Sequence, residues 1–193
     1  MRELVFLLEE RSAQAMLESL LGRFLSNEIA CRFIVFEGKQ DLEKQLVRKI
    51  RAYQNDCARF IILRDQDSHP DCQTLKKQLL DRCAESSKSD KCLVRIACRE
   101  LETFYLADLL AVEQALHLKG LANLQRRRKF SHPDDLGSPS RELKTLSKNT
   151  YEKVSGSRQI GQYLDVDNAR SRSFHNLICA IRRMEAVLLA AQV

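Results

Sequence analysis

The stretch Phe60-Ile-Ile-Leu-Arg-Asp-Gln-Asp67 decides the fold, because a largely apolar run leads directly into two aspartates. A short β-branched run that ends in acids is typical of a buried parallel strand that carries carboxylates to the edge of a sheet. The strand period of two predicts that Asp65 and Asp67 point to one side and Gln66 to the other.

Two carboxylates held that close repel each other unless a cation lies between them, and Mg²⁺ is the natural oxygen-seeking candidate. The alternative is ordinary: one aspartate caps the helix that follows, and the other is solvated. The choice between the two interpretations depends on the rest of the chain.

Three further apolar runs, over residues 4–8, 31–36 and 92–97, predict strands on either side of this one. Helical spacing over residues 12–24, 40–53 and 71–83 predicts helices between them, and a last helix is expected over 173–191. Strands that alternate with helices form βαβ units. We therefore expect an α/β fold with a mostly parallel four-stranded sheet flanked by helices.

Acids follow all four predicted strands. They are Glu9, Glu37, the Asp65/Asp67 pair and the Glu100/Glu102 pair. Ligands of parallel sheets bind outside the carboxyl ends of the strands. Four acid-tipped strands are harder to explain by coincidence than one Asp-x-Asp, so the pattern favours a metal site at this edge.

The net charge of +6 is unevenly distributed. Residues 1–108 hold 18 Lys+Arg and 18 Asp+Glu, while residues 109–193 hold 14 and 8, which gives 14 − 8 = +6. An acidic centre beside a basic surface suits a phosphodiester substrate, although a solvated basic face is the alternative. The pattern changes after residue 118, so we expect an α/β core over 1–118 and a basic, mainly helical extension over 119–193 that packs on it.

Composition excludes several classes of protein. No apolar run approaches the roughly 20 residues needed to span a bilayer, so we expect no membrane association. The N-terminus is too short and too acidic for a signal peptide. The 7 cysteines include no Cys-x-x-Cys pair and the 4 histidines are scattered, which predicts reduced thiols in a cytoplasmic protein without a zinc site.

Several polar residues are candidates for binding phosphate. Arg64 and Arg99 adjoin the acids, although each could simply pair with a nearby carboxylate. The Ser/Gly-rich segment 153–161 could wrap a phosphate or form an ordinary flexible turn; its candidates are Lys153, Ser155, Ser157 and Arg158. His69 could shuttle protons, although a plain loop residue is the alternative.

A basic run near the middle of the chain is a candidate for contacts to a nucleic-acid backbone, with a solvated loop as its alternative. It consists of Arg126, Arg127, Arg128 and Lys129.

The order strand–Glu, strand, strand–Asp-x-Asp resembles the Toprim fold of topoisomerases and primases. Over nearly its full length the chain is identified as a member of a bacterial family with that expected fold, domain-of-unknown-function 4276. The segments that carry the resemblance are Phe6-Leu-Leu-Glu-Glu10, Glu37-Gly-Lys-Gln-Asp-Leu-Glu-Lys44, Arg64-Asp-Gln-Asp-Ser68, Ala97-Cys-Arg-Glu-Leu-Glu102, Pro139-Ser-Arg-Glu-Leu143, Lys153-Val-Ser-Gly-Ser-Arg158 and Arg170-Ser-Arg-Ser-Phe174.

By position, the resemblance implies that Glu9, Asp65 and Asp67 form a catalytic Mg²⁺ or Mn²⁺ site. It implies that Glu102 matches the extra acid with which OLD-family nucleases build a second metal site. The glutamate of Toprim proteins is usually followed by glycine. Glu9 is followed by Glu10, whereas Glu37 is followed by Gly38, so Glu37 is kept as an alternative to Glu9. Glu10 is either a solvent-facing neighbour or an additional ligand.

The expected function is a metal-dependent, Toprim-like nuclease or phosphodiester-cleaving effector that acts on nucleic acid. The resemblance further implies an anti-phage defence or toxin-like role beside an ABC- or OLD-type ATPase. The alternative from another class is a non-catalytic module that binds nucleic acid or docks on the ATPase. A third option is phosphate-ester chemistry on a small substrate.

Overall fold

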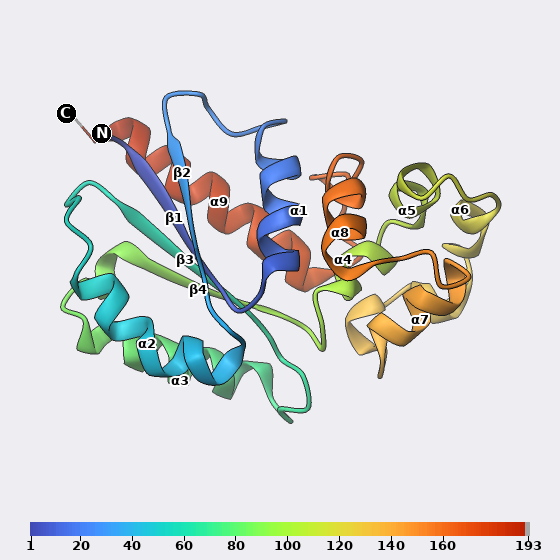
Figure 1. Cartoon of the computed structure of the whole chain (residues 1–193), viewed down its shortest axis with the longest axis horizontal. Helices are drawn as coiled ribbons and strands as arrows, with labels where there is room; N and C mark the ends of the chain where they lie inside the picture. Colours follow the sequence, from blue (N-terminus) through green and yellow to red (C-terminus); the bar gives the residue numbers. More distant parts are fainter. Residues whose placement is uncertain (192–193) are drawn as a thin grey trace.

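The computed structural model describes residues 1–191 and confirms an α/β architecture (Figure 1). A four-stranded, all-parallel sheet has the order β2-β1-β3-β4. Its strands are β1 (Glu3–Leu8), β2 (Ala30–Val35), β3 (Arg59–Asp65) and β4 (Cys92–Ala97). All four expected strands are present, and β1 and β3 lie side by side at the centre.

The sheet is covered by helices on both faces, as parallel strands require. Successive side chains of β1 alternate between the faces: Phe6 packs in a cluster with α1 (Arg11–Leu21) and α9 (Arg172–Ala190). Leu7 packs in a second cluster with α2 (Lys39–Arg51) and α3 (Cys72–Glu85). Because of this alternation, neighbouring residues at the end of a strand point to opposite faces of the sheet.

Five short helices continue the chain beyond the carboxyl ends of the strands and gather on one side of the sheet (Figure 1). They are α4 (Glu102–Leu106), α5 (Leu109–Ala115), α6 (Leu121–Leu124), α7 (Pro139–Leu146) and α8 (Lys153–Gly161). Single 3₁₀ turns form at Ser89–Lys91, Arg128–Phe130 and Pro133–Asp135. Side chains of these helices and of α9 share one hydrophobic cluster with β1 and β3, so the extension and the α/β core have a common interior.

The prediction for residues 153–161 was wrong, because this segment is a helix and neither a phosphate-wrapping loop nor a turn. Its glycines serve packing. A Cβ on Gly161 would come within 2.6 Å of the Met16 backbone oxygen, and one on Gly156 within 2.5 Å of the Tyr151 ring. Small residues therefore let α8 approach α1 closely.

The reasoning that placed both aspartates on one strand face was also wrong. β3 ends at Asp65, and Asp67 lies in a turn with a left-handed backbone (φ 53°). Arg99, after β4, is left-handed too (φ 63°). The Asp67 N–H donates to the Arg99 carbonyl (2.7 Å), and the Arg99 N–H donates to Gln66 Oε1 (3.2 Å). The two strand-end turns thus hold each other in place.

Within residues 1–191, none of the helices combines the length and the apolar character that crossing a bilayer demands.

Candidate functional site: a carboxylate cavity at the end of β3

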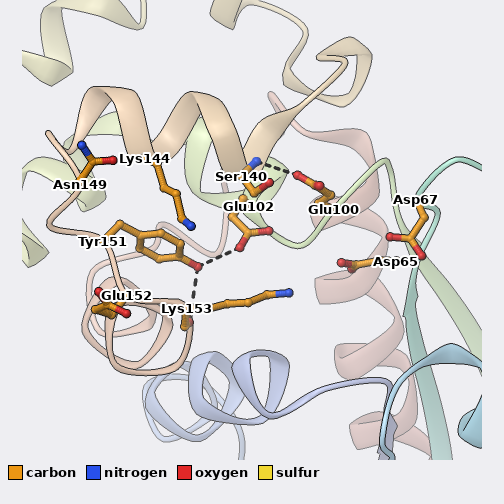
Figure 2. Close-up of a pocket in the computed structure, with 10 residues that line it drawn as sticks. All are labelled: Asp65, Asp67, Glu100, Glu102, Ser140, Lys144, Asn149, Tyr151, Glu152 and Lys153. Atoms are coloured by element: carbon orange, nitrogen blue, oxygen red, sulfur yellow. Dashed lines mark hydrogen bonds between the residues drawn. The ribbon is translucent and has the colours of Figure 1, made fainter.

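A cavity of about 480 Å³ opens where the carboxyl ends of β3 and β4 meet the extension (Figure 2). We call it the carboxylate cavity, because four acids from the strand ends and the following loop line it. They are Asp65, Asp67, Glu100 and Glu102, and the opposite wall is formed by Ser140, Lys144, Asn149, Tyr151, Glu152 and Lys153.

Asp65 is the most perturbed of these acids. It is only 9% exposed, and burial raises its pKa well above the usual range. The negative charges of Glu10, Glu102 and Glu9 raise this pKa further, in that order. A buried carboxyl group surrounded by three others is favoured in its neutral form unless a cation approaches it.

Glu102 begins α4 and is 1% exposed. Burial raises its pKa, against the stabilising effects of its own backbone N–H and of Lys153. The Tyr151 hydroxyl donates to Glu102 Oε1 (3.1 Å) and lies 3.2 Å from Ser157 Oγ. Glu102 is therefore held in one orientation by a buried hydrogen-bond network.

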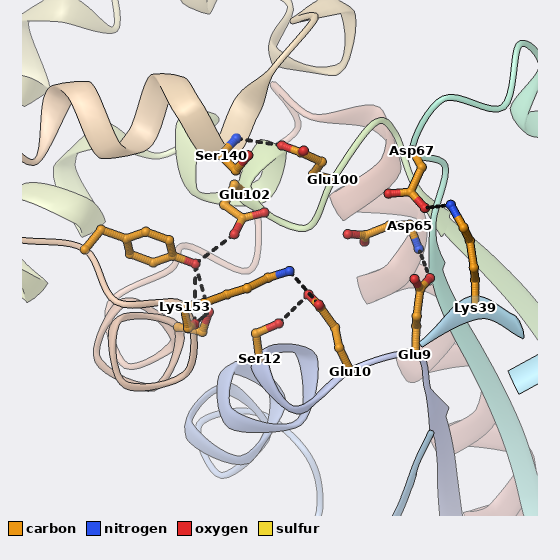
Figure 3. A network of polar contacts seen from close by, with 12 residues as sticks. Glu9, Glu10, Ser12, Lys39, Asp65, Asp67, Glu100, Glu102, Ser140 and Lys153 are labelled. Carbon is orange, nitrogen blue, oxygen red and sulfur yellow. Dashed lines mark hydrogen bonds and ion pairs between the residues drawn. The ribbon is translucent and has the colours of Figure 1, made fainter. Parts of the chain in front are cut away.

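Glu10 faces this group of acids and is paired with Lys153 (Figure 3). Lys153 Nζ lies 2.5 Å from Glu10 Oε2, and the Ser12 hydroxyl donates to the other carboxylate oxygen (2.5 Å). Burial lowers the pKa of Lys153, but Glu10, Glu102 and Asp65 outweigh that effect and raise it. Glu10 therefore lies beside the other acids and is not simply a solvent-facing neighbour of Glu9. Lys153 is the counter-ion that Glu10, Glu102 and Asp65 share.

Glu9 lies on the other side of the strand ends, toward α2 (Figure 3). Its Oε2 accepts from the Asp65 backbone N–H (3.2 Å) and lies 3.8 Å from Arg64 Nε, which is too long for a hydrogen bond. Burial and the charge of Asp67 raise the pKa of Glu9. Lys39 of α2 pairs with Asp67 (2.8 Å), and Asp67 raises the pKa of Lys39. The strand ends therefore carry two neighbouring acid–cation groups, one on each face of the sheet.

The structure brings Asp65, Asp67, Glu102 and Lys153 of the predicted site to one cavity, which Glu9 does not line. Arg64 is 6% exposed and pairs with Glu43 of α2, so it faces away from the cavity.

The other residues proposed for phosphate binding lie elsewhere. Arg158 pairs with Glu18 (2.9 Å), Ser157 is buried against Tyr151, Ser155 is exposed outside the cavity, and Arg99 lines a second cavity. Glu37 is exposed and does not line the cavity.

The basic run does not line the carboxylate cavity. Lys129 pairs with Glu142 (2.6 Å), while Arg126, Arg127 and Arg128 are exposed. His69 accepts from the Asp71 N–H through Nδ1 (3.2 Å), in the turn before α3. Its imidazole therefore helps shape a turn.

Sequence reasoning missed Glu100, Lys144 and Tyr151 as functional neighbours. Glu100 appeared only as a strand-end acid; its Oε2 accepts from the Ser140 N–H (2.6 Å), which joins the loop after β4 to α7. Lys144 and Tyr151 lie in the extension, and no local motif marks them. Their relation to the acids comes only from tertiary packing.

The donor set fits a hard divalent cation, since Asp65, Asp67 and Glu102 offer carboxylate oxygens to one cavity. In the side-chain positions of residues 1–191, no three His, Cys, Asp or Glu residues form a group that could hold a metal together. The fit therefore rests on the kind of donor atoms: two buried carboxylates, Asp65 and Glu102, lie near the half-buried Asp67, and a divalent ion would relieve their mutual repulsion.

Comparison with known protein families identifies the family of this chain. The model of a family described as "Domain of unknown function (DUF4276)" matches residues 8–182. The chain therefore belongs to the DUF4276 family, as expected. Neither the curated proteins nor the solved structures contain a match.

Proposed function

We propose that this protein is a Mg²⁺- or Mn²⁺-dependent phosphodiesterase that cleaves nucleic acid at the carboxylate cavity. The observation that carries the proposal is the crowding of acids around buried Asp65, whose pKa is raised by burial and by the charges of Glu10 and Glu102. Burying like charges costs free energy, and strongly perturbed carboxyl groups beside a cavity are typical of functional sites.

Asp65, Asp67 and Glu102 would hold the divalent ion, and the charge of Glu10 acts on Asp65 from nearby. When bound, such an ion polarises a phosphoryl oxygen and makes water a stronger nucleophile near neutral pH. Glu9 contributes by holding the Asp65 backbone N–H, and so fixes the end of β3.

The chain's own residues supply the remaining functions. Lys144 and Lys153 line the wall opposite the acids, where their charges would face the phosphate of a substrate. The Tyr151 hydroxyl donates to Glu102 and so orients the carboxylate that would bind the ion.

The wider setting is part of the proposal. A Toprim-type site joins strand one to strand three, and the adjacency of β1 and β3, which brings Glu9 to the Asp65 backbone, supports that relationship. All 7 cysteines are free thiols, which supports a cytoplasmic location. An ABC- or OLD-type ATPase in phage defence remains the partner that the resemblance implies.

The test is a cleavage assay on single-stranded DNA, duplex DNA and RNA, with tRNA and ATP as further substrates, in Mg²⁺, Mn²⁺ or EDTA. Cleavage should require the metal, and Asp65→Asn and Glu102→Gln should each lower the rate by at least about 100-fold. Asp81→Asn and Glu85→Gln are matched controls, because both residues are exposed on α3 away from the cavity. Metal-dependent cleavage that survives both cavity substitutions would refute the mechanism.

A second candidate is the non-catalytic module, which one observation favours: cations of the chain already pair with acids of the strand ends. Lys153 pairs with Glu10, and Lys39 pairs with Asp67. In that case the acids are structural. No nucleic acid would be cleaved, with or without an ATPase, and Mn²⁺ would leave the melting temperature unchanged.

A further inference from the structure

A second cavity, of about 710 Å³, runs along β4 between α3 and the start of α9. We call it the cationic groove, because five cationic side chains line it and only two acids do. The cations are Lys76, Arg95, Arg99, Arg170 and Arg172, and the acids are Asp134 and Asp135.

Unlike Lys153 of the carboxylate cavity, the cations of the groove form no ion pair with a carboxylate among residues 1–191. Arg95 Nε donates to the Asn176 carbonyl (2.8 Å), and Arg170 donates to the Ala107 carbonyl (3.4 Å). These bonds orient the guanidinium groups without neutralising them. A carbonyl-anchored arginine keeps its charge and its remaining N–H donors for an anion.

The two acids offset only part of the positive charge, because five cations line the same groove. Asp134 is occupied at the start of α9, where it accepts from the Ser171 hydroxyl (2.6 Å) and from the Ser173 N–H (2.9 Å). Asp135 is exposed. Beyond the groove, Arg183 follows Arg172 along α9 and lowers the pKa of half-buried Arg95, after the effect of burial itself. Positive charge thus accumulates along the open edge of β4.

The groove and the carboxylate cavity adjoin across the paired strand-end turns. Gln66 and Arg99 line the groove, Asp67 lines the carboxylate cavity, and hydrogen bonds of 2.7 and 3.2 Å join these turns. A chain of regularly spaced anions that lies in the groove would extend over this bridge to the acids.

We infer that the cationic groove binds the phosphodiester backbone of a nucleic acid and leads it to the carboxylate cavity. Binding stands on the groove alone, whereas the direction toward the cavity rests on the proposed function. Arginine donors match the geometry of phosphate oxygens, and each neutralised phosphate adds to affinity. A divalent ion at the neighbouring acids would bridge to a phosphate, which favours nucleic acid over an acidic peptide.

Lys76→Gln/Arg172→Gln tests the groove, because neither side chain has a hydrogen-bond or ion-pair partner in the described part of the chain, residues 1–191. Arg126→Gln/Arg127→Gln is the matched control: it removes the same charge from the exposed basic run, the other candidate for backbone contacts. Binding of fluorescein-labelled single-stranded DNA, duplex DNA and RNA of equal length is measured by anisotropy in EDTA, so that cleavage does not contribute. Unlabelled polyglutamate serves as the competitor.

The groove variant should bind at least about tenfold more weakly at low salt. The slope of log affinity against log salt for a single strand should fall by about 1.4, since each lost phosphate contact removes about 0.7. The control variant should bind like the wild type. Whichever nucleic acid binds most tightly in the wild type identifies the substrate class.

Unchanged binding in the groove variant, a loss confined to the control variant, or displacement by polyglutamate as effective as by nucleic acid would each overturn the inference. Groove-dependent binding without any cleavage would leave the binding role of the groove standing, and would refute the proposed function together with the direction toward the cavity. If the groove variant still cleaves nucleic acid and binds it as tightly as the wild type does, the proposed function stands and the inference about the groove is wrong.

Discussion

The backbone N–H of Asp65 donates a hydrogen bond to the Glu9 carboxylate (3.2 Å), although their side chains serve opposite faces of the sheet. Asp65 shares the face of α1 and α8 with Glu10, Glu102 and Lys153. Glu9 faces α2, where the charge of Asp67 raises its pKa; Asp67, in the turn after β3, pairs with Lys39 and also lines the carboxylate cavity. The two glutamates that follow β1 therefore have different functions: Glu9 supports the strand end, and Glu10 joins the acids.

This difference predicts that two conservative substitutions weaken Mn²⁺ binding to unequal extents. Glu10→Gln should weaken Mn²⁺ binding by about tenfold or more, because it removes a charge beside Asp65. Glu9→Gln keeps an oxygen for the Asp65 N–H, so it should have the smaller effect on Mn²⁺ binding. Titration calorimetry measures both. Glu37→Gln, at an exposed strand-end acid, is the control, and a larger loss in Glu9→Gln than in Glu10→Gln would contradict the assignment.

Stability should depend on pH through Asp65. A carboxyl group whose pKa is raised by folding takes up a proton on folding, so stability falls as pH rises above its ordinary value of 3.8 toward the raised value. In EDTA, Asp65→Asn should therefore raise the melting temperature at pH 7.5 by on the order of a few degrees. The gain should shrink toward pH 4.5. Scanning calorimetry tests this, with Asp81→Asn as control; a gain that grows on acidification would show the wrong sign.

Lys153 should affect metal binding and cleavage in opposite directions. It neutralises Glu10 and interacts with Glu102 and Asp65, so it competes with a divalent cation. Lys153→Met should tighten Mn²⁺ binding by severalfold and lower the cleavage rate by at least about tenfold. Lys77→Met, at an exposed position of α3, should change neither quantity. A parallel loss of both would mean that Lys153 acts only on the fold.

Tyr151 should matter through its hydroxyl. Tyr151→Phe removes the donor to Glu102 and leaves that buried carboxylate with one hydrogen bond fewer. Unfolding free energy should fall by about 1–3 kcal/mol. Tyr163→Phe, at an exposed tyrosine, should be neutral. Urea denaturation compares the two; equal midpoints would show that the buried hydroxyl contributes nothing.

Gly161→Ala should destabilise the contact between α1 and α8. The new Cβ would come within 2.6 Å of the Met16 backbone oxygen, and a backbone atom cannot move aside cheaply. Overpacking of this kind costs about 1–3 kcal/mol. Gly22→Ala is the matched control, since its Cβ would meet nothing within 4 Å and its φ is −59°. An unchanged urea midpoint in Gly161→Ala would show that the helices can separate at no cost.

Local sequence was sufficient for the α/β scaffold, because strands and helices have periods that are visible in short windows. The apolar run that ends at Asp65 predicted β3, and the acids after each strand predicted the edge at which the cavity lies. The prediction from local sequence was wrong for residues 153–161, where Ser and Gly indicated a loop. The helix forms there because its glycines allow close packing on α1 and Tyr151, which no local pattern records.

The family and the parallel sheet follow from the order of residues alone, since strand patterns and strand-end acids are local features of the chain. Which acids meet was decided only by the tertiary structure. Chain order places Glu9 and Glu10 side by side, but the alternation of the sheet sends them to different faces, with different cations. Lys144, Tyr151 and Lys153 line the same cavity as Asp65 only because the extension folds back over the strand ends, and such long-range packing leaves no local pattern in the sequence.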